Sequence, residues 1–264
     1  MRDFLNDIHE SLSDPDPVRR AQIQMKNPLP KRFYKEVGIR HDSDRFTVEL
    51  DGRTVKTPAK KVLSLPTRAA AELVAGEWRD QFDVIDPGRM PITRLVNSAL
   101  DGVANELDAV LGDIVKYAGT DLLCYRADAP QSLVDRQASK WDPVLYWAAD
   151  TLGARFILAE GIIHQEQPAS AIEAYARAIG KYRDPLAVAA LHTITTLTGS
   201  ALLALALAEG HLDAERAWTA AHADEDWNIE QWGADAEAEA RRAHRWQDMK
   251  ASCDLFDAVV RPEG

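Results

Sequence analysis

Two periods of apolar residues divide the chain into a strand-forming part and a helix-forming part. Between residues 33 and 65 apolar and polar residues alternate, which predicts short β-strands. Asp51-Gly52 interrupts this alternation and is the two-residue turn signal of an antiparallel hairpin. After Thr67 the apolar residues recur every three or four positions instead, which predicts helices, and Thr67 is a suitable N-cap. The apolar residues of the predicted strands are Val37, Ile39, Phe46, Val48, Leu50 and Val55, with one more strand at Val62, Leu63 and Leu65.

A few short antiparallel strands bury only one face, so another element must cover that face. The helix predicted after Thr67 is the best candidate, because its apolar residues lie at helical spacing: Leu73, Val74, Trp78 and Phe82. After Asp86-Pro87-Gly88 the pattern stays helical to the end. The predicted fold is therefore α+β, with a small N-terminal antiparallel β-rich domain followed by a larger all-α C-terminal domain. The predicted parts are an N-terminal arm (residues 1–30), the β-rich domain with its covering helix (31–90) and the helical domain (91–264).

The arm contains a short amphipathic pattern near Phe4, Leu5, Ile8 and Leu12, followed by the helix breaker Asp14-Pro15-Asp16-Pro17. Acids are scattered through these first residues. A secretory signal needs an uninterrupted apolar run and a mitochondrial presequence avoids acids, so neither is predicted. The expected location is the cytoplasm of a bacterium, or the mitochondrial matrix if this is a processed organellar form.

Residues 186–208 contain no Asp, Glu, Lys or Arg and could span a bilayer by length alone. However, a histidine, several threonines and Gly199-Ser200 interrupt the segment, and its flanks lack an aromatic belt or a one-sided excess of basic residues. We therefore favour a buried core element, either one helix or two helices that meet around Gly199-Ser200, with no stable membrane insertion.

Composition excludes some classes of function. The formal net charge of −11 and the pI near 5.1 argue against nucleic-acid binding, which needs clustered Lys and Arg. Cys124 and Cys253 lie far apart, in no metal or redox spacing, and we expect buried thiols. The chain has no GxxxxGK[ST] or GxGxxG loop, no GxSxG elbow and no HExxH pair. We predict no cofactor, no metal, no nucleotide and no catalytic residue set.

The remaining candidate chemistry lies near the C-terminus, where acids alternate with tryptophans. The residues of interest are Glu225, Trp227, Trp232, Asp235 and Glu237. Acids followed one turn later by arginines are typical of a solvated helix face. Tryptophans beside acids are also typical anchors of protein–protein interfaces. Both interpretations stay open on the pattern alone.

The order and spacing of many short fragments resemble one family, the assembly chaperones of the F1 sector of ATP synthase that act on its α subunit. The resemblance covers residues 31–242, and it departs from the family pattern at the arm and at Asn228, where a glutamine is usual. The matching fragments are Lys31-Arg32-Phe33-Tyr34, Leu50-Asp51-Gly52-Arg53, Lys56-Thr57-Pro58, Glu77-Trp78, Gln81, Met90-Pro91, Arg94-Leu95, Ala99-Leu100-Asp101, Tyr117, Thr120-Asp121-Leu122, Tyr125-Arg126, Gln137, Trp141-Asp142-Pro143, Thr198-Gly199-Ser200, Asp224-Glu225, Trp227, Trp232-Gly233, Asp235 and Glu237-Ala238.

This resemblance implies an ATP-independent chaperone that is not an enzyme. It would bind the newly made F1 α subunit and shield the surface that later meets the β subunit. We expect the contact at the five acidic and tryptophan residues named above. The rival hypothesis is an enzyme whose carboxylates act in a cleft between the domains, with Glu77, Asp101 and Asp121 as candidates. Acids at such positions are also common helix caps.

Overall fold

The computed structural model describes residues 29–160 and 165–262, which form two compact units. The first unit contains residues 29–105 together with residues 257–262, and the second is Glu106–Phe256. Almost all of the predicted N-terminal arm lies outside the described residues. The helix that begins at Pro91 belongs to the first of these units.

The first unit contains the predicted antiparallel sheet. Its strands are β1 (Val37–Asp42), β2 (Arg45–Leu50), β3 (Arg53–Thr54) and β4 (Ser64–Leu65), and β2 pairs with each of the others. At the β2–β3 turn Asp51 and Gly52 have φ angles of 48° and 76°, as a tight hairpin turn requires. The Asp51 carboxylate accepts hydrogen bonds from the backbone N–H groups of Glu36 and Lys35, which lower its pKa.

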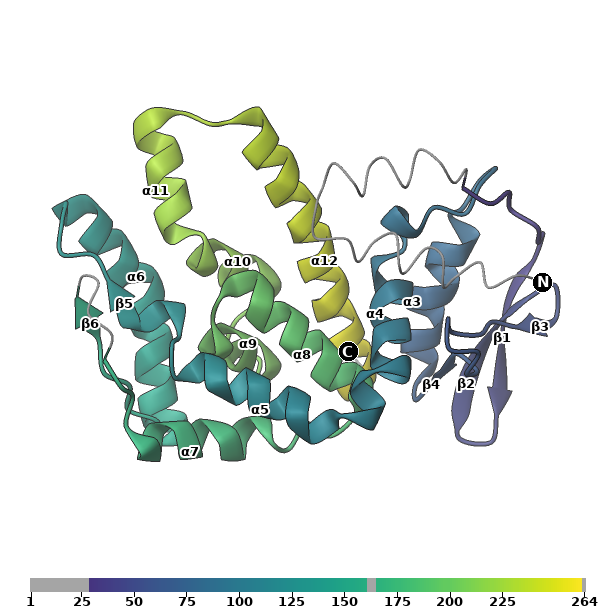
Figure 1. The fold of residues 1–264 in the computed structure, drawn as a ribbon, viewed down its shortest axis with the longest axis horizontal. Helices are drawn as coiled ribbons and strands as arrows, with labels where there is room; N and C mark the ends of the chain where they lie inside the picture. Colours follow the sequence, from purple (N-terminus) through teal and green to yellow (C-terminus); the bar gives the residue numbers. More distant parts are fainter. Residues whose placement is uncertain (1–28, 161–164, 263–264) are drawn as a thin grey trace. The chain divides into compact units, whose positions relative to one another are not determined.

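Helix α3 (Arg68–Arg79) packs against β1 and β2, as predicted (Figure 1). The Thr67 Oγ1 caps it by accepting a hydrogen bond from the backbone N–H of Ala70 at 3.1 Å. Val74 and Trp78 are buried on its inner face. Phe82 lies beyond the end of α3 and is 74% exposed, so its predicted place in the core was wrong.

Helices account for most of the remaining described chain, which confirms the predicted fold class. One short parallel strand pair, β5 with β6, was not predicted. The first unit adds η1 (Pro87–Arg89), α4 (Pro91–Asp101) and η2 (Val103–Asn105). The other elements are α5 (Leu107–Ala118), η3 (Leu122–Cys124), β5 (Tyr125–Arg126), α6 (Gln131–Trp147), η4 (Ala148–Leu152), β6 (Ala159–Glu160), α7 (Ala169–Ile179), α8 (Pro185–Thr198), α9 (Ala201–Ala208), α10 (Ala214–Ala221), α11 (Ala223–Trp232) and α12 (Ala236–Val260).

The uncharged stretch at residues 186–208 lies in two buried helices, α8 and α9, which is the second of the two core arrangements that the pattern left open. Gly199 ends α8 with a φ of 67°, and the Ser200 side chain caps α9 by accepting from the backbone N–H of Leu203. Every residue of α9 is buried. Among the described helices, none combines the length and apolar character needed to cross a membrane. The two cysteines are buried free thiols.

A fully buried carboxylate, Asp121, holds the N-terminus of α9 in place. It accepts hydrogen bonds from Ser200 Oγ at 2.7 Å, from Leu202 N at 2.9 Å and from Leu123 N at 3.0 Å. Burial raises its pKa to about 6, although these hydrogen bonds oppose the shift. The same side chain therefore caps both η3 and α9 from the inside of the second unit.

We expect the stability contribution of Asp121 to depend on pH in a direction opposite to that of most carboxylates. Its pKa is about 6 in the folded chain against an ordinary 3.8, so its contribution is complete below pH 3.8 and is lost as the pH rises through 6. Relative to Asp121→Asn, the wild type should lose about 2.4 kcal/mol of unfolding free energy between pH 4 and pH 7. Urea unfolding of both proteins across this range measures the difference, and parallel curves would contradict it.

Candidate functional site

A groove in the second unit runs between α11 and α12 and has a volume of about 670 Å³. Figure 1 shows α11 and the first half of α12 as two arms that are joined by the connection at residues 233–235. The lining residues come from α10, α11, α12 and this connection: Trp218, Glu225, Asn228, Ile229, Trp232, Gly233, Asp235, Ala238, Glu239, Arg242, Ala243 and Trp246.

Helical spacing explains which residues reach the groove. On α11 the lining residues recur at intervals of three and four: Glu225, Asn228, Ile229 and Trp232. On α12 and its N-cap the same intervals appear: Asp235, Ala238, Glu239, Arg242, Ala243 and Trp246. Each helix therefore presents one complete stripe to the groove, and each stripe combines apolar with charged side chains.

The groove is aromatic from its buried end to its exposed end. Trp218 and Trp246 lie with ring centroids 5.4 Å apart, and Trp218 packs into a core cluster with Met249 and Cys253. Trp232, at the last residue of α11, is 83% exposed. With so much of its surface exposed, Trp232 packs little against the described residues and is available to a partner.

The opposite face of α11 is fixed to α6 by polar contacts. The Gln137 side-chain amide donates to Asp224 Oδ1 at 2.8 Å, and the Trp227 indole N–H donates to Ser132 Oγ at 3.0 Å. Arg136 and Glu230 form an ion pair across the same interface. Because Asp224, Trp227 and Glu230 point to α6, the stripe on the other face of α11 remains open.

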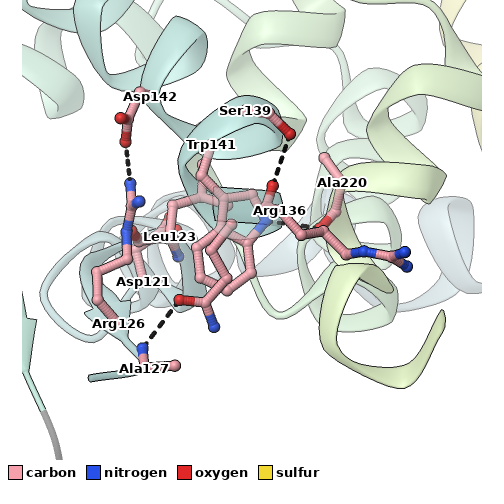
Figure 2. A network of polar contacts seen from close by, with 10 residues as sticks. Asp121, Leu123, Arg126, Ala127, Arg136, Ser139, Trp141, Asp142 and Ala220 are labelled. Atoms are coloured by element: carbon pink, nitrogen blue, oxygen red, sulfur yellow. Dashed lines mark hydrogen bonds and ion pairs between the residues drawn. The ribbon is translucent and has the colours of Figure 1, made fainter. Parts of the chain in front are cut away.

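Helix α6 is itself anchored by the polar network in Figure 2. The Trp141 indole N–H donates to the backbone carbonyl of Ala220 at 2.7 Å, which ties α6 to the end of α10. Arg126 lies 5.2 Å from the Trp141 ring centroid and forms a 2.7 Å ion pair with Asp142. Both aromatic and charged contacts therefore fix the helix on which α11 rests.

Two arginines on α12 brace the groove. Arg242 forms a 2.5 Å ion pair with Asp226 on α11, and both side chains are mostly buried. Arg245 donates to the backbone carbonyl of Leu197 at 2.6 Å, which ties α12 to α8. These contacts hold α12 against α11 and α8. The groove between α11 and α12 stays accessible.

A buried histidine lies where α10 ends and α11 begins. The His222 ring centroid is 3.9 Å from that of Trp218, and its Nδ1 is 2.8 Å from the Trp218 carbonyl oxygen. Burial lowers the His222 pKa, although the nearby Glu225 carboxylate at 3.8 Å opposes the shift. A lowered pKa favours the neutral ring at pH 7, so His222 contributes little positive charge beside Glu225.

The structure separates the five residues that the sequence grouped together. Glu225, Trp232 and Asp235 line the groove. Trp227 turns to α6 instead, and Glu237 is on the outer side of α12, where it pairs with Arg241. The pattern missed Trp218, Ile229, Glu239 and Trp246 as lining residues, although the intervals of three and four from Glu225 and Asp235 would have indicated Ile229 and Glu239.

Comparison with known proteins identifies the family. Residues 31–149 match the family model described as ATP12 chaperone protein. The crystal structure of the Atu1473 protein from Agrobacterium tumefaciens matches with 55% identity and a TM-score of 0.88, covering 98% of this chain and 97% of that one. Atp12 from Paracoccus denitrificans matches with 41% identity and a TM-score of 0.82, covering 87% of this chain and 98% of that one. The chain belongs to the ATP12 chaperone family.

The mitochondrial protein atp12 of Schizosaccharomyces pombe is a more distant relative, 22% identical over 81% of this chain and 78% of its own length. Membership of the ATP12 family makes this chain a chaperone of ATP synthase assembly, as the resemblance implied. The family-model match ends at residue 149, so it does not include the groove.

The three carboxylates considered for catalysis all cap backbone groups inside their own units. Glu77 accepts from Ile92 N and Thr93 N at 2.7 Å each, at the start of α4, and burial raises its pKa. Asp101 accepts from Thr57 Oγ1 at 2.6 Å and from the backbone N–H of Ala59 at 3.0 Å. Asp121 caps α9, as described above. Glu77 and Asp121 are therefore helix caps, the role that the sequence offered as the alternative to catalysis, whereas Asp101 holds residues 57–59.

Substitutions of two groove tryptophans should separate exposure from packing. We expect Trp232→Ala to change the unfolding free energy by less than about 0.5 kcal/mol, because the side chain is 83% exposed. Trp218→Ala removes a buried ring from the core and should cost about 3–5 kcal/mol. Urea unfolding followed by circular dichroism compares the two. Similar losses for both variants would show that Trp232 packs against its own chain.

Proposed function

We propose that this ATP12-family chaperone binds the newly made α subunit of F1-ATPase without ATP and shields the surface that later meets the β subunit. The observation that carries the proposal is the groove between α11 and α12, whose aromatic lining ends in the exposed Trp232. Glu225, Trp227, Trp232, Asp235 and Glu237 are the proposed contact region. We place this activity in a bacterial cytoplasm or, for an organellar form, in the mitochondrial matrix, in keeping with its bacterial and mitochondrial relatives.

The need for such a chaperone follows from the chemistry of a ring of alternating subunits. A subunit exposes an interface-sized apolar surface until its neighbour arrives, and exposed apolar surfaces of this size aggregate. A protein that covers the surface reversibly lowers the free concentration of the aggregating species. Tryptophans are effective for this purpose, because they bury a large area on binding and have few rotatable bonds.

Co-expression with each F1 subunit alone tests the choice of client. We expect the tagged chaperone to retain the α subunit in a pull-down and to leave the β subunit in the unbound fraction. It should also raise the soluble fraction of α in the absence of β. Retention of β and not α, or of neither, would contradict the proposal.

A charge reversal on the outer side of α12 tests how far the contact region extends. We expect Glu237→Lys to weaken α-subunit capture without changing the helix content. Glu237 is 84% exposed on its side chain, and its pair with Arg241 is a surface i,i+4 contact that contributes little to stability. Pull-down and circular dichroism are measured on the same preparation. If capture is unchanged while the protein melts at a lower temperature, Glu237 has a structural role only.

A further inference from the structure

The charged residues around the groove are predominantly acidic. Residues 223–242, which form α11 and the start of α12, contain seven acids and two arginines. Of these, Glu225, Asp235 and Glu239 line the groove. The lining arginine, Arg242, is already paired with Asp226. Arg241 pairs with Glu237 on the outer side, and Arg245, which is not among the lining residues, donates to the backbone carbonyl of Leu197. The lining therefore holds three carboxylates and one guanidinium, and that guanidinium is paired with an acid outside the lining.

Aromatic rings lie among these carboxylates. Trp218, Trp232 and Trp246 line the same groove as the three acids, together with Ile229. Apolar side chains pack well on indole rings, and a guanidinium or ammonium group is attracted both to the ring face and to a nearby carboxylate. A partner side chain that is acidic would instead be repelled. The lining is thus complementary to a segment that carries apolar and basic residues together.

We propose that the groove selects an apolar client segment that carries arginine or lysine, and that Glu225, Asp235 and Glu239 are the residues that provide this selectivity. The inference rests on the proposed function, because it names the chemistry of the client segment at the same site. The N-terminal arm of this chain is a poorer occupant, since residues 1–28 contain five acids and four bases.

A triple variant without the three groove charges, here called the groove-neutral variant, tests this selectivity. Its substitutions are chosen to preserve the local fold. Asp235 Oδ1 accepts from the backbone N–H of Ala238 at 2.8 Å and caps α12, so Asp235→Asn keeps an acceptor while removing the charge. Glu225→Gln and Glu239→Gln are isosteric as well. The matched control carries Asp150→Asn, Glu166→Gln and Glu173→Gln, which remove the same charge from exposed positions of the second unit outside the groove lining.

Two synthetic amphipathic peptides with identical leucines serve as probes, one with arginines at its polar positions and one with glutamates. We expect the wild type to bind the arginine peptide at least about tenfold more tightly at low salt, as measured by fluorescence anisotropy. The groove-neutral variant should lose most of this preference, whereas the control variant should keep it. Added salt should reduce the preference of the wild type.

Three results would overturn the inference. The first is equal binding of the two peptides by the wild type, and the second is an equal loss of preference in the control variant, which would assign it to the general acidity of the second unit. The third is a concentration-dependent dimer that the arginine peptide dissociates, which would assign the groove to a second copy of the chain. If the triple variant does not fold, the exposed Glu239→Gln alone makes the same comparison.

The peptide assay contains no F1 subunit, so its result is independent of the test of the proposed function. Capture of the α subunit without a preference between the peptides would leave the client assignment intact and reject the selectivity. Preference for the arginine peptide without capture of the α subunit would reject the client assignment and leave the chemistry of the groove in place.

Discussion

The attachment of α11 to α6 is the interaction on which the groove depends. A short helix of mixed composition does not stay folded by its own propensity in water, so tertiary contacts must fix it. Here the contacts on one face are polar and specific: the Gln137 amide donates to Asp224, and the Trp227 indole N–H donates to Ser132. They fix the rotation of α11 about its axis. That rotation turns the stripe from Glu225 to Trp232 away from α6 and toward α12.

Buried contacts of the second unit fix the position of α6, to which α11 is attached. Trp141 is fully buried and its indole N–H is satisfied by Ala220, so α6 has one register against α10. The buried carboxylate of Asp121 fixes the start of α9, the most apolar helix of the core. Buried polar groups that are fully hydrogen-bonded specify a unique packing, because any other arrangement leaves them without partners. The exposed aromatic site is thus supported by a core with little freedom to collapse onto it.

The local elements were predictable from sequence because local rules govern them. The hairpin at Asp51-Gly52, the cap at Thr67 and the break at Gly199-Ser200 each carry a signal that lies within a few neighbouring residues, even though distant residues also contact them. The prediction that Phe82 is a core residue was wrong because the helical spacing of apolar residues continues in the sequence beyond Arg79, where α3 ends. The site was harder, since the direction of Trp227 is decided by Ser132, which lies far away in the chain. No periodicity within α11 could reveal which of its two faces would meet α6.

The division of α11 also explains why acids and tryptophans are interleaved along it. A helix that must be held on one side and offer a surface on the other needs polar anchors and apolar contacts in alternating stripes. Asp224 and Glu225 are adjacent in sequence, yet Asp224 accepts a hydrogen bond from Gln137 and Glu225 faces the groove. A carboxylate thus has a structural role in one stripe and an electrostatic role in the other. A charge reversal in this segment is therefore interpretable only when the stripe that carries it is known.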